Sequence, residues 1–308
     1  MKKLSFLVAA LLATGFATSA KDLTVKSVQQ LDTPDNIFVG EAVISADGNY
    51  VVMSDLATNS LTGVNLSTGA SKKIAENGSM TGLKMTADGS KVVYRERVTD
   101  AKKRAHTVVN SVDVAKGKKT RLSEPTRDFS GFSLSKDAVV HTAEMTANNT
   151  ARRKAKSVTG EAANVDATPV VGIHRGDLVL TVGNKTTILN PQGKGSYMWA
   201  SISPDGKKIV YYKSQSGCYV CNLDGSGVVS LGYIHAPKWY GNDTVIGMQD
   251  FDNGTYVTES TLVAADMSGK VQKLTDNSRI AMYPSGSAEA GKIVFTDTDG
   301  HVFLLTVE

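Results

Sequence analysis

Residues 202–212, ISPDGKKIVYY, hold a pattern that the chain repeats: residues 44–54 read ISADGNYVVMS and residues 85–95 read MTADGSKVVYR. Each copy predicts a β-hairpin, because a short strand ends in Ser or Thr, an Asp-Gly pair turns the chain, and a β-branched apolar run returns it. The returning runs are apolar on both faces, which is typical of a strand packed between two neighbouring sheets. The repeat therefore predicts an all-β fold built from similar units.

Weaker copies of the pattern align without gaps at residues 132–142 and 238–247, and the second half of a sixth copy is residues 291–296. The Asp position falls at 47, 88, 135, 205, 241 and 289, and most of these intervals have the length of a propeller blade. A second hairpin follows most copies, which gives four strands per unit. We therefore predict a six-bladed β-propeller of four-stranded antiparallel blades.

Two segments stand outside these six units. The last unit lacks a fourth strand, and residues 22–28 would supply it, closing the ring with the N-terminal strand. Residues 145–170 have little strand patterning and are interpreted as an insertion within blade three, with residues 176–182 and 185–190 as that blade's outer strands. The alternative is a seventh blade hidden in the 70-residue interval between the third and fourth copies.

The first residues have the pattern of a secretory signal peptide: two lysines, an apolar run over residues 4–12, and small residues at 18–20. We expect residues 1–20 to be the signal peptide and residues 21–308 to form a single propeller domain in the periplasm or outside the cell. No later run approaches 18 apolar residues, so we expect no membrane insertion. Without the signal the chain has 32 basic and 30 acidic residues, which gives no support for nucleic acid as a partner.

The SPDG copy is preceded by Trp199-Ala200-Ser201-Ile202, and a similar segment, Ala236-Pro237-Lys238-Trp239, occurs in the fifth copy. In these features the chain resembles the WD-repeat-like propellers of the TolB type, over residues 21–308. The resemblance implies a propeller in the cell envelope that works by protein–protein contact. TolB has an additional N-terminal α/β domain, whereas about 20 residues separate the signal from the first blade here. We therefore do not expect a direct role in the Tol system.

Compact catalytic motifs are missing from the sequence: there is no G-x-S-x-G, no G-x-x-x-x-G-K-[ST] and no H-E-x-x-H. We therefore expect no enzyme activity and no cofactor. Paired acids at residues 250–254, 297–300 and 222–225 resemble the start of a calcium loop. In a loop that begins at Asp250, however, the twelfth position is Thr261 rather than the Glu that such a loop needs. Hairpin turns explain these acids equally well, and we expect no metal site.

Cys218 and Cys221 are the two cysteines of the chain and lie three residues apart in a predicted strand. Residues at this spacing point to opposite faces of a strand, which favours two buried structural thiols. A strained disulfide, redox chemistry and half of a metal site are the alternatives.

The loops that join each fourth strand to the next first strand should surround the mouth of the central channel. Aromatic and Arg residues, the types enriched at interface hot spots, occur there, although aromatics at strand starts also pack between blades. The candidate binding residues are Tyr197, Trp199, Tyr233, His235 and Arg279. His235 is the one histidine that directly precedes a first strand, which makes it the candidate base if the propeller is an enzyme.

Basic residues concentrate in loops of blades two and three, which should emerge on the same face. They are Arg95, Arg97, Arg104, Arg152 and Arg153. We interpret them as a patch for an acidic partner or an anionic envelope polymer, with plain solvated loops as the alternative. The expected function is therefore a non-catalytic, monomeric binding or scaffold module for envelope proteins. The alternative is a lyase, hydrolase or small-ligand binder that uses the channel on an envelope saccharide or peptide.

Overall fold

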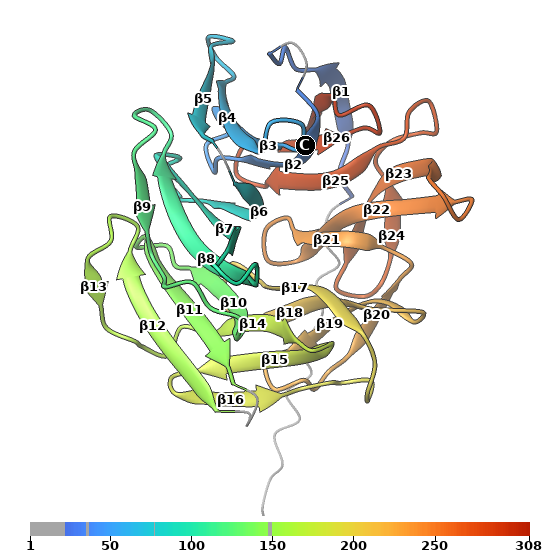
Figure 1. The fold of residues 1–308 in the computed structure, drawn as a ribbon. Helices are drawn as coiled ribbons and strands as arrows, with labels where there is room; N and C mark the ends of the chain where they lie inside the picture. The colour runs from blue at the N-terminus through green and yellow to red at the C-terminus, as the bar shows by residue number, and fades with distance from the viewer. Residues whose placement is uncertain (1–21, 35–36, 77, 147–149) are drawn as a thin grey trace, which may run out of the picture.

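The computed structural model describes residues 22–34, 37–76, 78–146 and 150–308, so the expected signal peptide lies outside the described residues. The chain forms a β-propeller of seven antiparallel sheets arranged around a centre (Figure 1). We number the sheets as blades one to seven in chain order. No helix in the described ranges has the length and apolar character needed to span a membrane.

The strands of each blade are as follows. Blade one has β2 (Val39–Ile44), β3 (Tyr50–Asp55), β4 (Ser60–Asn65) and β5 (Ser71–Ala75). Blade two has β6 (Ser79–Met85), β7 (Lys91–Thr99), β8 (Ala105–Asp113) and β9 (Lys119–Arg121). Blade three has β10 (Phe129–Leu134), β11 (Val139–Met145), β12 (Ala151–Ser157) and β13 (Ala162–Ala163). Blade four has β14 (Val170–His174), β15 (Asp177–Val182) and β16 (Lys185–Ile188).

The remaining blades complete the circle. Blade five has β17 (Tyr197–Ile202), β18 (Lys208–Lys213), β19 (Gly217–Asn222) and β20 (Val229–Gly232). Blade six has β21 (His235–Trp239), β22 (Thr244–Asp252), β23 (Val257–Asp266) and β24 (Val271–Lys273). Blade seven has β25 (Met282–Ser287), β26 (Lys292–Thr296), β27 (Val302–Val307) and, as its outer strand, β1 (Val25–Gln30). The pairing of β1 with β27 is the one expected from the sequence.

The predicted number of six blades is wrong, because the long interval contains blade four. Its first hairpin joins β14 to β15 through Arg175 and Gly176, which both have positive φ angles of 53° and 90°. Two central residues with positive φ form a type I′ turn, so this hairpin needs no Asp-Gly pattern. Self-comparison therefore could not detect it, and the strands assigned to the outside of blade three are the second and third strands of blade four.

The interpretation of residues 145–170 as an insertion is also corrected. This stretch contains β12, which pairs with β11 from Met145↔Ala151 to Val139↔Ser157, and the short β13. The third copy was aligned two residues out of place: Ser135 Oγ donates to Asp137 Oδ1 at 2.5 Å, so Asp137 has the role of the repeated Asp. In this turn Ala138, with a φ of 60°, takes the place of glycine.

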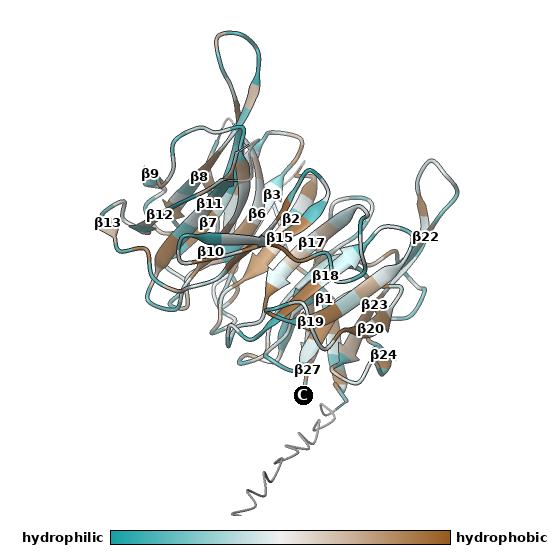
Figure 2. Cartoon of the chain, turned by 90° about the horizontal axis from the view of Figure 1, so that it is seen from below, coloured by the Kyte–Doolittle hydropathy of each residue, from teal (hydrophilic) through white to brown (hydrophobic). Residues whose placement is uncertain are grey.

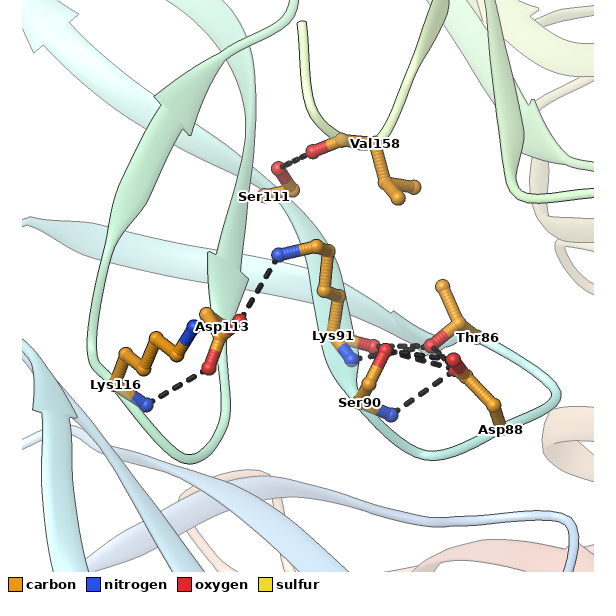
Figure 3. A network of polar contacts seen from close by, with 8 residues as sticks. All are labelled: Thr86, Asp88, Ser90, Lys91, Ser111, Asp113, Lys116 and Val158. Atoms are coloured by element: carbon orange, nitrogen blue, oxygen red, sulfur yellow. Dashed lines mark hydrogen bonds and ion pairs between the residues drawn. The ribbon is translucent and has the colours of Figure 1, made fainter.

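The repeated turn is stabilised by side chains that bond to the backbone, as blade two illustrates (Figure 3). Thr86 Oγ1 donates to Asp88 Oδ1 at 2.5 Å, and the same carboxylate accepts the amide of Ser90 at 3.1 Å. The amide of Lys91 donates to Thr86 Oγ1 at 3.1 Å, and Gly89 supplies a φ of 67°. The repeated motif therefore stabilises the turn, because its polar groups form hydrogen bonds with one another rather than with a ligand.

Hydrophobic side chains fill the spaces between neighbouring blades, and Figure 2 shows apolar segments on the strands and polar ones on many loops. Val52 and Val92 belong to the cluster between blades one and two, and Val93 and Phe132 to the one between blades two and three. Blades three and four meet through backbone, since a Cβ on Gly172 would lie 1.7 Å from the carbonyl oxygen of Ser130. The second strands thus have apolar side chains on both faces, as predicted.

Candidate functional site

One face of the propeller carries the starts of the first strands and the ends of the second strands, and we call it the mouth face. The first strands of blades five, six and seven have a register shift near this face. Trp199, Ala236 and Tyr283 at these shifts have φ angles of 52°, 46° and 49°, which are uncommon for residues other than glycine. Such β-bulges redirect side chains, and here they help to place aromatic rings at the mouth.

Five ring-bearing residues from blades five and six form a continuous cluster, which we call the aromatic surface: Trp199, Tyr212, Tyr233, His235 and Phe251. The imidazole of His235 lies at its centre, with its ring centroid 5.2 Å from that of Trp199, 4.5 Å from Tyr212 and 4.4 Å from Tyr233. Phe251 stacks on Tyr233 at 6.4 Å. The side chains therefore support one another in a fixed arrangement.

A buried carboxylate lies beside the central imidazole. Nδ1 of His235 lies 2.8 Å from Oδ1 of Asp250, and Asp250 is only 6% exposed. Burial and the neighbouring Asp250 charge raise the pKa of the Tyr212 and Tyr233 hydroxyls. Both tyrosines are therefore neutral hydroxyl groups at ordinary pH.

The aromatic surface is accessible to solvent. Trp199 is 39% exposed, Tyr233 43% and Phe251 62%. The ends of β22 and β23, which carry Phe251, form a hairpin that projects from the ring (Figure 2). Tyr256, in the turn of that hairpin, is 65% exposed. This face therefore presents large apolar rings that the fold itself does not bury.

The structure brings together three of the five predicted mouth residues: Trp199, Tyr233 and His235. Tyr197 is buried, packs against Tyr211 at 5.5 Å, and its hydroxyl donates to the carbonyl oxygen of Gly193 at 2.9 Å, so it lies outside the exposed surface. Its prediction as a contact residue fails because its side chain turns into the core between blades.

Arg279 packs elsewhere, with its guanidinium carbon 4.2 Å from the ring centroid of Phe303. The sequence prediction did not include Tyr212, Asp250 and Phe251, because it covered the loops that lead into the first strands. Asp250 was interpreted as a turn residue, although it belongs to β22. The ends of the second strands, on the same face, were the signal that could have identified all three.

The predicted basic residues differ in their contacts. Arg95 and Arg97 are exposed on β7, whereas Nε of Arg104 donates to Asp100 Oδ2 at 2.8 Å. Arg152 lies 3.9 Å from Asp128. Arg153 donates to the carbonyl oxygens of Asp166, Gly183 and Thr168, so it connects blade three to blade four.

Charged side chains of the first strands meet across the centre. Lys238 Nζ of blade six lies 3.4 Å from Glu41 Oε1 of blade one, and the other oxygen of Glu41 accepts the amide of Gly82 at 2.7 Å. Lys84 Nζ donates to the carbonyl oxygen of Phe132 at 3.2 Å. Burial, together with the nearby charges of Lys238 and Arg95, lowers the pKa of Lys84 to about 8. The centre of the ring is polar and crossed by an ion pair.

The two cysteines and the acidic turn at Asp297 are accounted for by burial and by hydrogen bonds of the fold. Cys218 and Cys221 are free, buried and on opposite faces of β19, in separate hydrophobic clusters, and burial raises the pKa of both thiols to about 12. Asp297 Oδ1 accepts the amides of Asp299 and His301, as in a hairpin turn. These three residues are the single group among the described ranges with metal-ligand spacing.

Comparisons with known proteins identify the fold alone. No family model matches the chain, and no curated protein matches it. Among solved structures it is similar to the oligogalacturonate lyase of Vibrio parahaemolyticus, with 14% identity, 92% of this chain and 96% of that chain covered, and a TM-score of 0.60. An oligogalacturonate lyase in complex with manganese gives 14% identity, coverage of 95% and 98%, and a TM-score of 0.63. The β-propeller domain of the Trilobed protease from Pyrococcus furiosus gives 15% identity, coverage of 90% of this chain and 96% of that chain, and a TM-score of 0.60.

Proposed function

We propose that this propeller is a non-catalytic binding module that docks a protein partner on the aromatic surface of its mouth face. The observation that carries the proposal is the exposure of Trp199, Tyr233 and Phe251 around an ordered centre. Trp and Tyr are enriched among the residues that dominate binding energy at protein interfaces. Because these rings already contact one another, little side-chain entropy is lost when a partner covers them.

The proposal places the module in the cell envelope, as the signal-like residues 1–20 and the TolB-type resemblance suggest. The partner is then an envelope protein, and the propeller acts as a monomer. The pairing of β1 with β27 would hold the two ends of the ring together while a partner binds. No activity is carried over from the lyases or the protease that share the fold, because a propeller supports many unrelated functions.

Comparative capture tests the proposal. A Tyr233→Ser, Phe251→Ser variant removes two exposed rings, and an Ile188→Ser, Val271→Ser variant removes two exposed apolar side chains, 43% and 38% exposed, from outer strands of blades four and six. We expect the wild type and the outer-strand variant to retain the same envelope protein, and the first variant to lose at least tenfold of it. Equal retention by all three proteins would refute docking at this surface.

A second candidate function is supported by the 2.8 Å contact between His235 and Asp250. A histidine beside a buried carboxylate can act as a general base, and a propeller lyase or hydrolase acting on an envelope saccharide or peptide could use it. The two functions separate experimentally. Turnover of such a substrate that is abolished by His235→Asn would favour catalysis, whereas partner capture by the wild type without turnover of such substrates would favour docking.

A further inference from the structure

Blade two lies across the ring from blades five and six, which carry the aromatic surface (Figure 1). A hollow of about 310 Å³ opens on the mouth face of blade two. Its walls come from β6, β7, β8 and the loop that leads into blade three. We propose that it is a binding site for an oxyanion, the carboxylate or phosphate group of a ligand about as large as one sugar ring. The site is separate from the proposed docking surface and goes beyond the proposed function.

Strand register explains why cationic and hydroxyl groups meet here. Arg97 pairs with Ser79 of β6 on one side and with Thr107 of β8 on the other, so these three side chains form a row across the sheet. Thr81 and Arg95 form the next row, and Nε of Arg95 donates to Thr81 Oγ1 at 3.2 Å. Arg95 and Arg97 are two residues apart and therefore lie on the same face of β7.

That face is the one turned toward blade three. Val93, two residues before Arg95, packs in the cluster between blades two and three with Phe132. The interface is thus apolar in its interior and becomes cationic where it opens at the mouth. The opposite wall is fixed by two backbone hydrogen bonds between Thr107 and Thr126, of 2.8 and 2.9 Å, which place Arg127 beside the hollow.

The hollow is lined by three arginines, Arg95, Arg97 and Arg127, and by one acid, Glu96. Among the described residues, no ion pair involves Arg95, Arg97 or Arg127. Glu96 points to the other face of β7, where it accepts hydrogen bonds from Asn110 and Lys119, both of 2.6 Å. The hollow therefore has a positive potential that a bound anion would relieve.

A further acid, Asp100 in the turn between β7 and β8, is already paired with a cation of the same turn. Asp100 Oδ2 binds the guanidinium of Arg104, and its Oδ1 accepts the amides of Lys102 and Arg104 at 2.9 Å each. These hydrogen bonds lower the pKa of Asp100 to about 2, so it remains a charged partner of Arg104. His106 contacts both residues of this pair: its Nδ1 lies 3.0 Å from the carbonyl oxygen of Arg104, and its Nε2 lies 4.0 Å from Oδ2 of Asp100.

The residue types and the size define the ligand class. Planar guanidinium groups bind carboxylate and phosphate oxygens through two parallel hydrogen bonds. Hydroxyls of Ser79, Thr81 and Thr107 can donate to further oxygens. A volume of about 310 Å³ is at the lower end of ligand pockets, which suits a single acidic sugar better than a longer chain.

Calorimetric titration of the protein with glucuronate, glucose 6-phosphate and glucose tests the proposal at low salt. We expect one or both charged sugars to bind and glucose to show at least tenfold weaker binding. An Arg97→Gln, Arg127→Gln variant should lose at least tenfold in affinity for the charged sugar. The two exposed arginines can be replaced without opening the core, and circular dichroism will verify the fold of the variant.

A Lys185→Gln, Lys194→Gln variant removes the same charge from exposed positions on other blades and should bind as the wild type does. Arg97→Lys retains the charge but not the paired geometry, so an intermediate loss supports recognition by the guanidinium. The preferred charged sugar identifies the oxyanion as carboxylate or phosphate. Two results would overturn the proposal: no binding of either charged sugar, or a loss of affinity in the Lys185→Gln, Lys194→Gln variant as large as that in the arginine variant. The Tyr233→Ser, Phe251→Ser variant should bind the charged sugar normally, which separates this site from the docking surface.

Discussion

Replacing Gly172 with alanine tests the arrangement of blades three and four. A Cβ at this position would lie 1.7 Å from the carbonyl oxygen of Ser130 and 3.1 Å from Cα of Gly131, and all of these atoms belong to backbone. No side-chain rotation can relieve the overlap, so the first strands β10 and β14 must separate by more than 1 Å. Overpacking of this kind costs about 3 kcal/mol or more of the free energy of unfolding. For a chain of this size we expect a fall in Tm of roughly 6 °C.

Gly63→Ala in β4 is the matched control. Its Cβ would meet Val114 Cγ1 at 3.5 Å, which is ordinary van der Waals contact, and an alanine in a strand is otherwise about 0.5 kcal/mol more favourable than glycine. Differential scanning calorimetry of both variants should show a large loss for Gly172→Ala and a change within about 2 °C for Gly63→Ala. Equal melting temperatures would refute the close approach, and would be expected if residue 172 lay in a loop away from β10.

Three further predictions concern buried polar and thiol groups. The pKa of Lys84 in the folded protein is about 8, below its ordinary value of 10.5. Between pH 8 and 10.5 the unfolded chain therefore binds more protons than the folded one, so the free energy of unfolding rises with pH. Relative to Lys84→Met, the wild type should gain about 1–2 kcal/mol between pH 8 and 9.5 in urea titrations, and parallel curves would contradict this. Cys218 and Cys221 should react with a thiol reagent only at the rate of unfolding, and fast labelling of the native protein would contradict their burial. Ser111→Ala should lose about 1–3 kcal/mol in denaturant titrations, because the carbonyl of Val158 loses a 2.6 Å buried hydrogen bond, and an unchanged midpoint would show that the bond contributes little.

The repeat made most of the fold predictable from the sequence. Each Ser/Thr-x-Asp-Gly turn carries its own hydrogen bonds, as Thr86 and Asp88 show, so local sequence determines local structure. Blade four escaped because its hairpin turns through Arg175 and Gly176 and has no repeated side chain to recognise. The number of blades depends on such weak units, whereas the type of fold does not.

The candidate site was only partly predictable. Trp199, Tyr233 and His235 lie close to repeated motifs at the starts of first strands, and their place on the mouth face followed from topology. Asp250 and Phe251 lie at the end of a second strand. Asp250 approaches His235 and Phe251 stacks on Tyr233, beside the bulge in β21. A bulge moves side chains without leaving a clear sequence signal, so sequence reasoning could not bring these residues together.

Site-specific photo-crosslinking tests the central claim most directly. A benzophenone amino acid replaces Phe251 on the aromatic surface in one protein and Ile188 on β16 in another, both exposed apolar positions. We predict that, under irradiation in the native envelope, the first protein forms a discrete adduct with one envelope protein and the second does not. Adducts from Ile188 alone, or no adduct from either position, would contradict the claim that a protein docks on the mouth face.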